Sequence, residues 1–231
     1  VRSRGLGDVY KRQYLSFDSW HRPSSLWNVY RCYLYGSYKK YDAYPNIEKR
    51  AMALADVLRN MTIYIEEEQL LAGNQASSNR AAPLFPEYAF AYILDELDDL
   101  EKRSSDKFTI TEENKKVLRE ILPWWEGKTL KDRAIAMQPQ EVLDDRVAGV
   151  LGWQGNVSTG EGHIVPDYDM VVRLGFAGLR DKIQKHIDEL DLSKPQDLEK
   201  LTFYRACKAI IDGCLDYIKR YLSLIHISEP T

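Results

Sequence analysis

The sequence predicts a mostly helical chain, because three features of its pattern agree. Apolar residues recur at every third or fourth position through most of the chain after Asn46, which is the spacing of one helix face. Threonine caps and prolines bound several of these periodic segments. Strand-like apolar runs are confined to residues 62–73, which is too little for an independent α/β sheet.

The first predicted helix begins at Asn46, which we place as its N-cap. Its apolar face consists of Ala51, Leu54, Ala55, Leu58 and Met61. Two short apolar pieces, Thr62–Ile65 and Leu70–Gly73, then flank an acidic turn and predict a small hairpin. Residues 14–45 contain many tyrosines, but their periodicity is too weak to predict an element.

The middle of the chain predicts four shorter helices. A polar loop that ends in two prolines precedes a helix from about Glu87 to Lys102. Thr111 caps the next helix, which Pro123 stops because proline lacks the N–H that a helix needs. Thr129 begins a third helix, and residues 140–151 form a fourth. The apolar face expected for the third helix holds Leu130, Ala134 and Met137.

A glycine-rich loop and two long helices complete the prediction. The loop runs from Gly149 to Pro166, and a loop of this length within a compact chain is usually functional or mobile. The helices cover residues 167–190 and 196–221, each with an apolar stripe at helical spacing. The stripes consist of Val172, Phe176, Leu179, Ile183, Ile187 and Leu190, and of Leu198, Leu201, Cys207, Ile210, Cys214 and Ile218.

The bulk composition argues against several classes of protein. A formal net charge of −3 gives no electrostatic reason to expect a nucleic-acid partner. No apolar run approaches the roughly 20 residues that a membrane helix needs, so we expect no membrane association. The cysteines, at positions 32, 207 and 214, are odd in number and sparse. They therefore argue against a disulfide scaffold and favour a reducing, cytoplasmic location.

The two ends of the chain are related at the level of DNA. Codons can be chosen for Arg4–Gln13 whose reverse complement translates as Leu222–Thr231, residue for residue. This segment resembles a transposase adapter used to prepare sequencing libraries. We therefore expect residues 1–13 and 222–231 to derive from adapter sequence, and residues 14–221 to derive from the gene. A natural inverted repeat is the alternative interpretation.

His163 is the titratable residue that most strongly suggests a functional site. It lies in the loop GEGHIVPDY, where Gly160 and Gly162 would let a ligand approach the backbone closely. Asp167 follows near the start of the next helix, a position that the helix dipole alone also favours for a carboxylate. The loop has neither phosphate-binding pattern, because no Gly-Lys-Ser/Thr enters a helix and no strand precedes the glycines.

The other reactive side chains predict no catalytic or metal site. The histidines lack the spacing of a metal site, and no serine or cysteine nucleophile can be paired with a histidine. Cys207 and Cys214 fall on one face of a predicted helix, where we expect core cysteines. The acidic run Asp95–Asp99 is expected to be a solvated helix face.

Three longer phrases occur in the order KRAMALADVLRNMTIYIEEEQLLAGNQASSNRAAPLFPEY, FTITEENKKVLREILPWWEGKTLKDRA and GNVSTGEGHIVPDYDMVVRLGFAGLRDKI. In this order they resemble the N-terminal part of glycyl radical enzymes. The resemblance covers residues 38–221 and is to the pyruvate formate-lyase-like domain, in particular its dehydratase and lyase branch. That branch includes glycerol and propanediol dehydratases, choline trimethylamine-lyase and hydroxyproline dehydratase.

The resemblance implies a fold and a chemistry for the full-length enzyme. The fold is a ten-stranded α/β barrel, to which this chain would supply mostly outer helices. In the family a radical-activating enzyme, using S-adenosylmethionine and an iron–sulfur cluster, makes a radical on a backbone glycine. That radical passes to a cysteine in the barrel, and the resulting thiyl removes a hydrogen from a small-molecule substrate. The resemblance also implies a homodimer.

Two short motifs look like the radical elements of the family but depart from them. Arg146–Gly149 begins as the radical motif Arg-Val-x-Gly-Tyr does, but Val150 replaces the tyrosine. Gly213–Asp216 resembles the Gly-Cys-x-Glu cysteine loop, but it has Asp for Glu and falls within a helical stripe. We therefore expect both catalytic elements beyond Tyr221. This chain is then expected to bind no cofactor or metal and to be inactive alone.

The site residues that the resemblance implies are few. His163 matches a pocket histidine that contacts a substrate hydroxyl in the dehydratase branch, and Asp167 is a second substrate-binding candidate. The motif from Gly73 to Pro83 is interpreted as scaffold. The full-length protein is predicted to be a radical C–O or C–N lyase. The alternatives are an acyl-transferring formate C-acetyltransferase and a non-catalytic helical interaction module.

Overall fold

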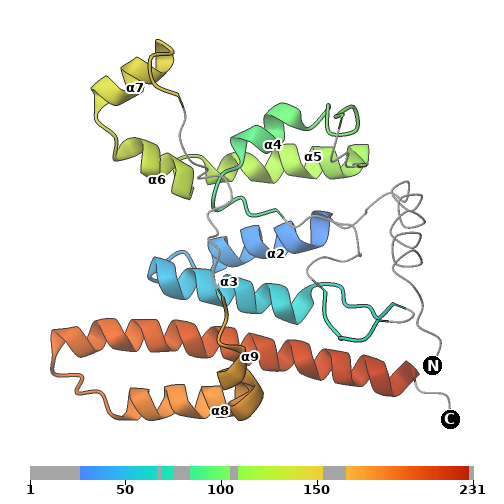
Figure 1. The fold of residues 1–231 in the computed structure, drawn as a ribbon, viewed down its shortest axis with the longest axis vertical. Helices are drawn as coiled ribbons and strands as arrows, with labels where there is room; N and C mark the ends of the chain where they lie inside the picture. The colour runs from blue at the N-terminus through green and yellow to red at the C-terminus, as the bar shows by residue number, and fades with distance from the viewer. Residues whose placement is uncertain (1–26, 67–68, 75–83, 105–108, 153–164, 229–231) are drawn as a thin grey trace. The chain divides into compact units, whose positions relative to one another are not determined.

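The structure is a computed structural model of the chain, and it describes residues 27–66, 69–74, 84–104, 109–152 and 165–228. The described residues form helices and connecting loops, and no strand occurs among them (Figure 1). The helices are α2 (Trp27–Lys40), α3 (Asn46–Asn60), α4 (Ala91–Glu96), α5 (Glu112–Ile121), α6 (Leu130–Ala136), α7 (Gln140–Val147), α8 (Tyr168–Asp188) and α9 (Pro195–Ser228), with a 3-10 turn η2 (Leu122–Trp125) after α5. The prediction of a mostly helical chain is confirmed.

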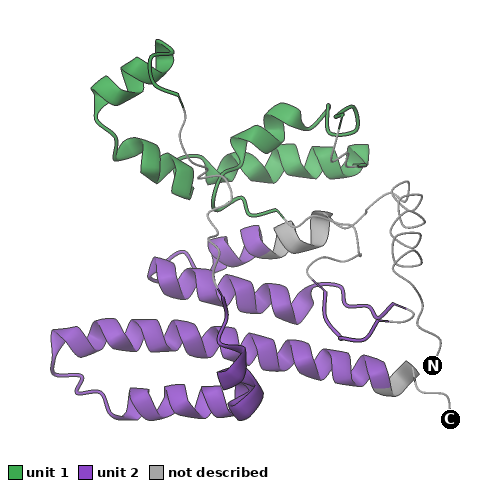
Figure 2. Ribbon diagram, in the orientation of Figure 1, with its two compact units in different colours: residues 1–25, 84–162 green, residues 26–83, 163–231 purple. Residues whose placement is uncertain are grey.

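The chain divides into two compact units (Figure 2). Unit 1 comprises residues 1–25 and 84–162, and its described part holds α4 to α7. Unit 2 comprises residues 26–83 and 163–231, with α2, α3, α8 and α9. Unit 2 is therefore built from two segments that are distant in the sequence.

The helices of unit 2 follow the spatial order α2, α3, α9, α8 (Figure 1). Three of the six buried residues of α3 are alanines, and Ala51, Ala53 and Ala55 are each at most 3% exposed. Small side chains let a neighbouring backbone approach closely, and Gly213 of α9 is the residue that faces Ala55. Arg220 of α9 donates hydrogen bonds to the carbonyl oxygens that end α3, those of Leu58 and Met61.

Two differences from prediction occur at the start of unit 2. Pro45, not Asn46, is the N-cap of α3, and Asn46 is already helical. The extended backbone of Pro45 suits a cap, and its carbonyl accepts a hydrogen bond from the Lys49 N–H at 2.9 Å. The preceding helix, α2, was not predicted because part of its contact with α3 is polar: the Ser37 hydroxyl donates to the Asp56 carboxylate at 2.8 Å.

The hairpin predicted over residues 62–73 is wrong, because residues 62–66 and 69–73 form no strand. The Gln69 side chain forms hydrogen bonds with backbone groups of this segment. Its Oε1 accepts from the Glu66 N–H at 3.0 Å, and its Nε2 donates to the carbonyls of Leu71 and Gly73. The apolar residues of this segment are therefore not held by strand pairing, and Leu70 is 96% exposed.

In unit 1 a helix was predicted from Glu87 to Lys102, but only the shorter helix α4 is present, with turns on both sides. The carbonyls of Glu87 and Tyr88 accept hydrogen bonds from the N–H groups of Leu130 and Lys131 instead. They bond to the start of α6 and so do not begin a helix of their own. Residues after α4 form successive turns, in which Asp99 and Lys102 donate to carbonyls three positions earlier.

Both threonine caps in unit 1 are confirmed. The Thr111 hydroxyl accepts from the Asn114 N–H at 3.2 Å and begins α5. Thr129 and Asp132 form a reciprocal capping box at the start of α6, with hydrogen bonds of 3.0 and 3.1 Å. The α-helix gives way to the 3-10 turn around Pro123, as predicted. The apolar face expected for α6 is not buried, and Met137 is 85% exposed.

Each of the last two helices was expected to carry one continuous apolar stripe. The observed helices differ from this expectation. α8 is interrupted at Gly175, whose φ of 61° and ψ of 171° lie outside the helical region. No residue of α8 is fully buried, and Val172 is 83% exposed. α9 extends from Pro195 to Ser228, beyond its predicted end. Its stripe is only partly covered, since Leu198 and Ile218 remain exposed.

Candidate functional site

Of the two predicted substrate-binding residues, only Asp167 can be placed, because His163 lies outside the described residues. Asp167 is the N-cap of α8, and its Oδ1 accepts a hydrogen bond from the Met170 N–H at 2.9 Å. Its carboxylate therefore compensates the unpaired N–H groups at the helix start. Asp167 is exposed, and capping uses one of its two carboxylate oxygens.

The first motif that resembles a radical element ends a helix. Gly149 has a φ of 75°, which a glycine adopts without a steric penalty. Its N–H bonds to the Arg146 carbonyl, and the Val150 N–H bonds to the Asp145 carbonyl. This pair of hydrogen bonds is the Schellman arrangement at a helix C-terminus. A structural role thus accounts for the glycine in the Arg146–Gly149 motif.

The second such motif belongs to the contact between α3 and α9. Gly213 is buried against Ala55, and Asp216 pairs with Arg59 at 2.8 Å between Oδ2 and Nε. Cys214 and Cys207 are half-buried rather than fully buried, and both are free thiols. Burial raises the pKa of each thiol, which disfavours the reactive thiolate. Neither cysteine has the environment of a nucleophile.

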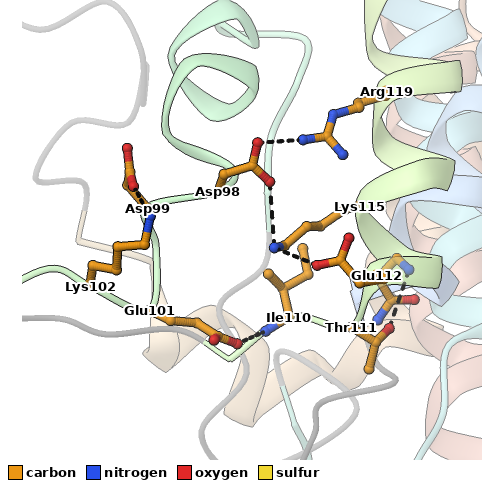
Figure 3. Close-up of polar contacts among 10 residues, drawn as sticks. Asp98, Asp99, Glu101, Lys102, Ile110, Thr111, Glu112, Lys115 and Arg119 are labelled. Atoms are coloured by element: carbon orange, nitrogen blue, oxygen red, sulfur yellow. Dashed lines mark hydrogen bonds and ion pairs between the residues drawn. The ribbon is translucent and has the colours of Figure 1, made fainter.

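In the acidic run of unit 1 the three aspartates are exposed, whereas Leu97 is buried, and only part of the run lies in a helix. Asp98 lies after α4 and faces α5, where its carboxylate binds Arg119 at 2.6 Å and Lys115 at 3.5 Å (Figure 3). The hydrogen bond from Arg119 is the main cause of a lowered pKa at Asp98. Asp99 pairs with Lys102 in the following turn. The run therefore ties the segment after α4 to α5 and presents no constellation for catalysis.

A polar cluster in unit 2 joins Asn74 to α9, and no sequence motif had indicated it. The Asn74 N–H donates to the Tyr217 hydroxyl at 2.9 Å, and the Asn74 Nδ2 donates to the Thr62 carbonyl at 3.1 Å. The Tyr221 hydroxyl reaches both the Asn74 Oδ1 and the Tyr64 carbonyl. Only the spacing of the two tyrosines, one helical turn apart, was visible beforehand, because their partner lies far away in the sequence.

Among the described residues there is no group of three or more His, Cys, Asp or Glu side chains that could hold a metal ion. None of the described helices combines the length and the apolar character needed to cross a bilayer. Both findings concern only the part of the chain that the structure describes.

The sequence pattern of one protein family, Pyruvate formate lyase-like, matches residues 10–228. The chain belongs to this family. Among curated relatives of this pyruvate formate lyase-like chain is "Probable dehydratase YbiW" of Escherichia coli (strain K12). That protein is 36% identical over 176 residues, which are 76% of this chain and 22% of the relative.

Two solved structures show the same fold. One is a glycyl radical enzyme from Archaeoglobus fulgidus, with a TM-score of 0.79 and 31% identity over 91% of this chain and 27% of that chain. The other is the glycerol-bound B12-independent glycerol dehydratase from Clostridium butyricum, with a TM-score of 0.78 and 28% identity over 84% of this chain and 25% of that chain. The pyruvate formate lyase-like chain thus spans about a quarter of the length of these proteins.

These matches confirm the predicted family and fold class. The described residues are mostly helical, and the chain matches about a quarter of the length of a solved glycyl radical enzyme.

Proposed function

We propose that the full-length protein is a glycyl radical lyase of the dehydratase type, which removes a hydroxyl or amino group from a small polar substrate. The observation that carries this proposal is the 36% identity with a protein named as a probable dehydratase. The glycerol-bound dehydratase of similar fold is a second support, because the molecule bound to it is a small polyol.

This chain would be the N-terminal portion of that enzyme. A glycyl radical supplies the unpaired electron for hydrogen abstraction in this class of enzyme. The described residues do not fit that group, because Gly149 ends a helix and Gly213 packs against Ala55. No step of the radical chemistry is therefore assigned to them, and the radical glycine and the cysteine would lie beyond Tyr221.

In this proposal His163 contributes to substrate binding. A histidine hydrogen-bonded to a substrate hydroxyl would orient the leaving group and donate a proton to it as the C–O bond breaks. Asp167, four positions later, would keep one oxygen on the Met170 N–H and offer the other to the substrate. The cap would then fix the carboxylate at the start of α8, so that the substrate meets an oriented acceptor.

The remaining assignments rest on the family, on the sparse cysteines and on the codon relation between the two ends of the chain. The full-length enzyme would require a radical-activating enzyme that uses S-adenosylmethionine and an iron–sulfur cluster, would be a homodimer and would work in the cytoplasm. Residues 14–221 would be the gene-encoded part, flanked by adapter-derived residues 1–13 and 222–231. Reading the gene beyond Tyr221 tests the assigned boundary at Tyr221 and the type of reaction. A cysteine followed by x-Glu would support the lyase, and two adjacent cysteines would indicate acyl transfer instead.

The experiment for the site uses the full-length enzyme, activated under anaerobic conditions and assayed with a panel of small diols and amino alcohols. His163→Ala should lose at least about a hundred-fold in turnover, the usual contribution of a general acid. The glycyl radical signal in electron paramagnetic resonance should persist, which separates this loss from misfolding. His186→Ala is the matched control, since His186 lies half-buried on α8, where it stacks on Tyr204. Full activity in His163→Ala would refute the assignment.

A further inference from the structure

The break in α8 depends on the backbone conformation of Gly175 and not on close packing. Its φ of 61° and ψ of 171° lie in a region that is essentially restricted to glycine. A Cβ atom added at Gly175 would meet nothing within 4 Å, so glycine is not needed there to make room for a neighbour. The observed conformation alone therefore requires glycine at this position.

The break divides α8 into a first part, residues 168–174, and a second part, residues 176–188, which meet at a kink (Figure 1). The Lys182 Nζ of the second part lies 3.9 Å from the Met170 Sδ of the first part. In a continuous helix these two residues would be about 18 Å apart along the axis, which is farther than their side chains can span. The contact is thus specific to the observed form, which we call the folded-back form.

The apolar stripe of α8 continues across the break in the sequence. Phe176 and Leu179 of the second part are half-buried, whereas Val172 is 83% exposed. In a continuous helix, residues four positions apart lie on the same face, so Val172 would extend the stripe by one turn beyond Phe176. The folded-back form therefore keeps one residue of the stripe in water.

Two contacts give the register of α8 on α9. His186 stacks on Tyr204, with ring centroids 5.5 Å apart. Gln184, which precedes His186 in α8, accepts a hydrogen bond at 2.6 Å from Lys208, which follows Tyr204 in α9. The two helices therefore run antiparallel, and a residue earlier in α8 lies opposite a residue later in α9.

This register provides a partner for Val172 on α9. Val172 lies 14 positions before His186, and Ile218 lies 14 positions after Tyr204. Such a separation is close to four helical turns, so each residue shares a face with the member of the stacked pair on its own helix. A continuous α8 would therefore bring Val172 opposite Ile218, which is 38% exposed in the folded-back form.

We propose that Gly175 is a hinge, and that α8 also adopts a continuous form in which Val172 packs against Ile218 of α9. The hinge can move because glycine adopts both the observed conformation and the helical one. Asp167 caps the first part of α8, so its carboxylate moves with that part. The hinge is a property of this chain and does not depend on the proposed catalytic function.

Two pairs of introduced cysteines report the two forms in the whole chain. The native cysteines are first replaced by alanine at Cys32, Cys207 and Cys214. Met170→Cys with Lys182→Cys reports the folded-back form, because a short bismaleimide joins these positions only when they are close. Val172→Cys with Ile218→Cys reports the continuous form through a disulfide made with copper phenanthroline, since a disulfide needs Cα atoms within about 7 Å. Both pairs should cross-link if the forms interconvert.

Gly175→Ala should shift the balance toward the continuous form, because alanine is strained in the observed conformation and favours the helix. The disulfide between positions 172 and 218 should then form about ten-fold faster, and the bismaleimide should join positions 170 and 182 about ten-fold more slowly. Gly36→Ala is the matched control, since Gly36 lies in α2 and also has room for a Cβ. That variant should leave both rates unchanged.

Val172→Asn tests the contact itself, because it removes an apolar side chain that only the continuous form would bury. Added to Gly175→Ala, it should restore the faster joining of positions 170 and 182. Failure to restore it would overturn the pairing with Ile218. The hinge would be overturned if no disulfide forms between positions 172 and 218 with either residue at position 175. Loss of helix content in Gly175→Ala, measured by circular dichroism, would also overturn it.

Discussion

Gly213 of α9 lies directly against Ala55 of α3, so that a Cβ atom on Gly213 would stand 2.7 Å from the Ala55 Cα and 2.9 Å from its Cβ. Real side chains do not approach so closely, and neither of these atoms can rotate away. The contact between α3 and α9 therefore requires glycine at this position. The same contact explains why a motif resembling a radical enzyme's cysteine loop occurs within a helix.

Gly213→Ala should destabilise the chain by about 1–3 kcal/mol, the usual cost of overpacking a well-packed contact. The measurement is the free energy of unfolding in urea. Gly36→Ala is the matched control, because Gly36 lies in α2 with no atom within 4 Å of an added Cβ. That variant should be neutral or more stable by about 0.5–1 kcal/mol. Equal stability of the two variants would contradict the close contact.

Gly149→Ala should weaken the end of α7, because a φ of 75° costs a residue with a Cβ about 1–2 kcal/mol. The amide of Val150, which bonds to the Asp145 carbonyl at 2.9 Å, is the reporter. Its hydrogen exchange should accelerate in Gly149→Ala and change less in Gly149→Asn, since asparagine tolerates this conformation better. Unchanged protection of Val150 in the alanine variant would argue against the Schellman cap.

Asp98→Asn should lower the stability of unit 1 in a manner that depends on pH. Pairing with Arg119 lowers the pKa of Asp98 in the folded chain below the unfolded value of about 3.9. The pair therefore stabilises at neutral pH, and this contribution is lost as the pH falls through the folded pKa. Urea midpoints of variant and wild type should differ at pH 7 and converge in acid. Asp95→Asn, an exposed neighbour in α4, supplies the comparison.

Cys214 and Cys207 should react slowly with iodoacetamide while the chain is folded. Because burial raises the pKa of both thiols, less thiolate is present at pH 8 than for a free cysteine. Peptide mass spectrometry after timed alkylation gives the rate at each site, with the urea-unfolded chain as reference. A Cys214 that alkylates faster in the folded state would reveal an activated thiol and reopen its candidacy as a catalytic residue.

Substitutions at Asp167 separate its capping role from binding. Asp167→Asn keeps an oxygen for the Met170 N–H, whereas Asp167→Ala removes it and should cost about 1 kcal/mol of stability. If the carboxylate also binds substrate, Asp167→Asn in the full-length enzyme should raise KM while leaving the free energy of unfolding nearly unchanged. Wild-type kinetics in Asp167→Asn would leave this residue as a cap alone.

The parts of the fold that were predicted correctly are those set by neighbours in the sequence. The Thr129 cap follows from a threonine and an aspartate three positions apart, and the spacing is visible in the sequence. The boundary at Pro123 rests on the missing N–H of one residue. The candidate substrate-binding residues, His163 and Asp167, were also proposed from a local motif, and their role in binding stays a prediction.

The failures come from partners that lie far away in the sequence. The carbonyls of Glu87 and Tyr88 are taken by α6, which no local pattern reveals. The side chain of Asn74 meets residues of α9 across a separation of 143 positions or more. The break in α8 at Gly175 was hidden because a glycine inside an apolar helical stripe is also compatible with an unbroken helix.

The order in which unit 2 can assemble during synthesis follows from the pairing of α3 with α9. Arg59 and Asp216, which join these helices, are separated by 157 positions. At about 5–20 residues per second, translation leaves α3 without its partner for roughly 8–30 s. During that time the alanine-rich face of α3 is available to ribosome-associated chaperones, while the helices of unit 1 emerge and can fold in the interval.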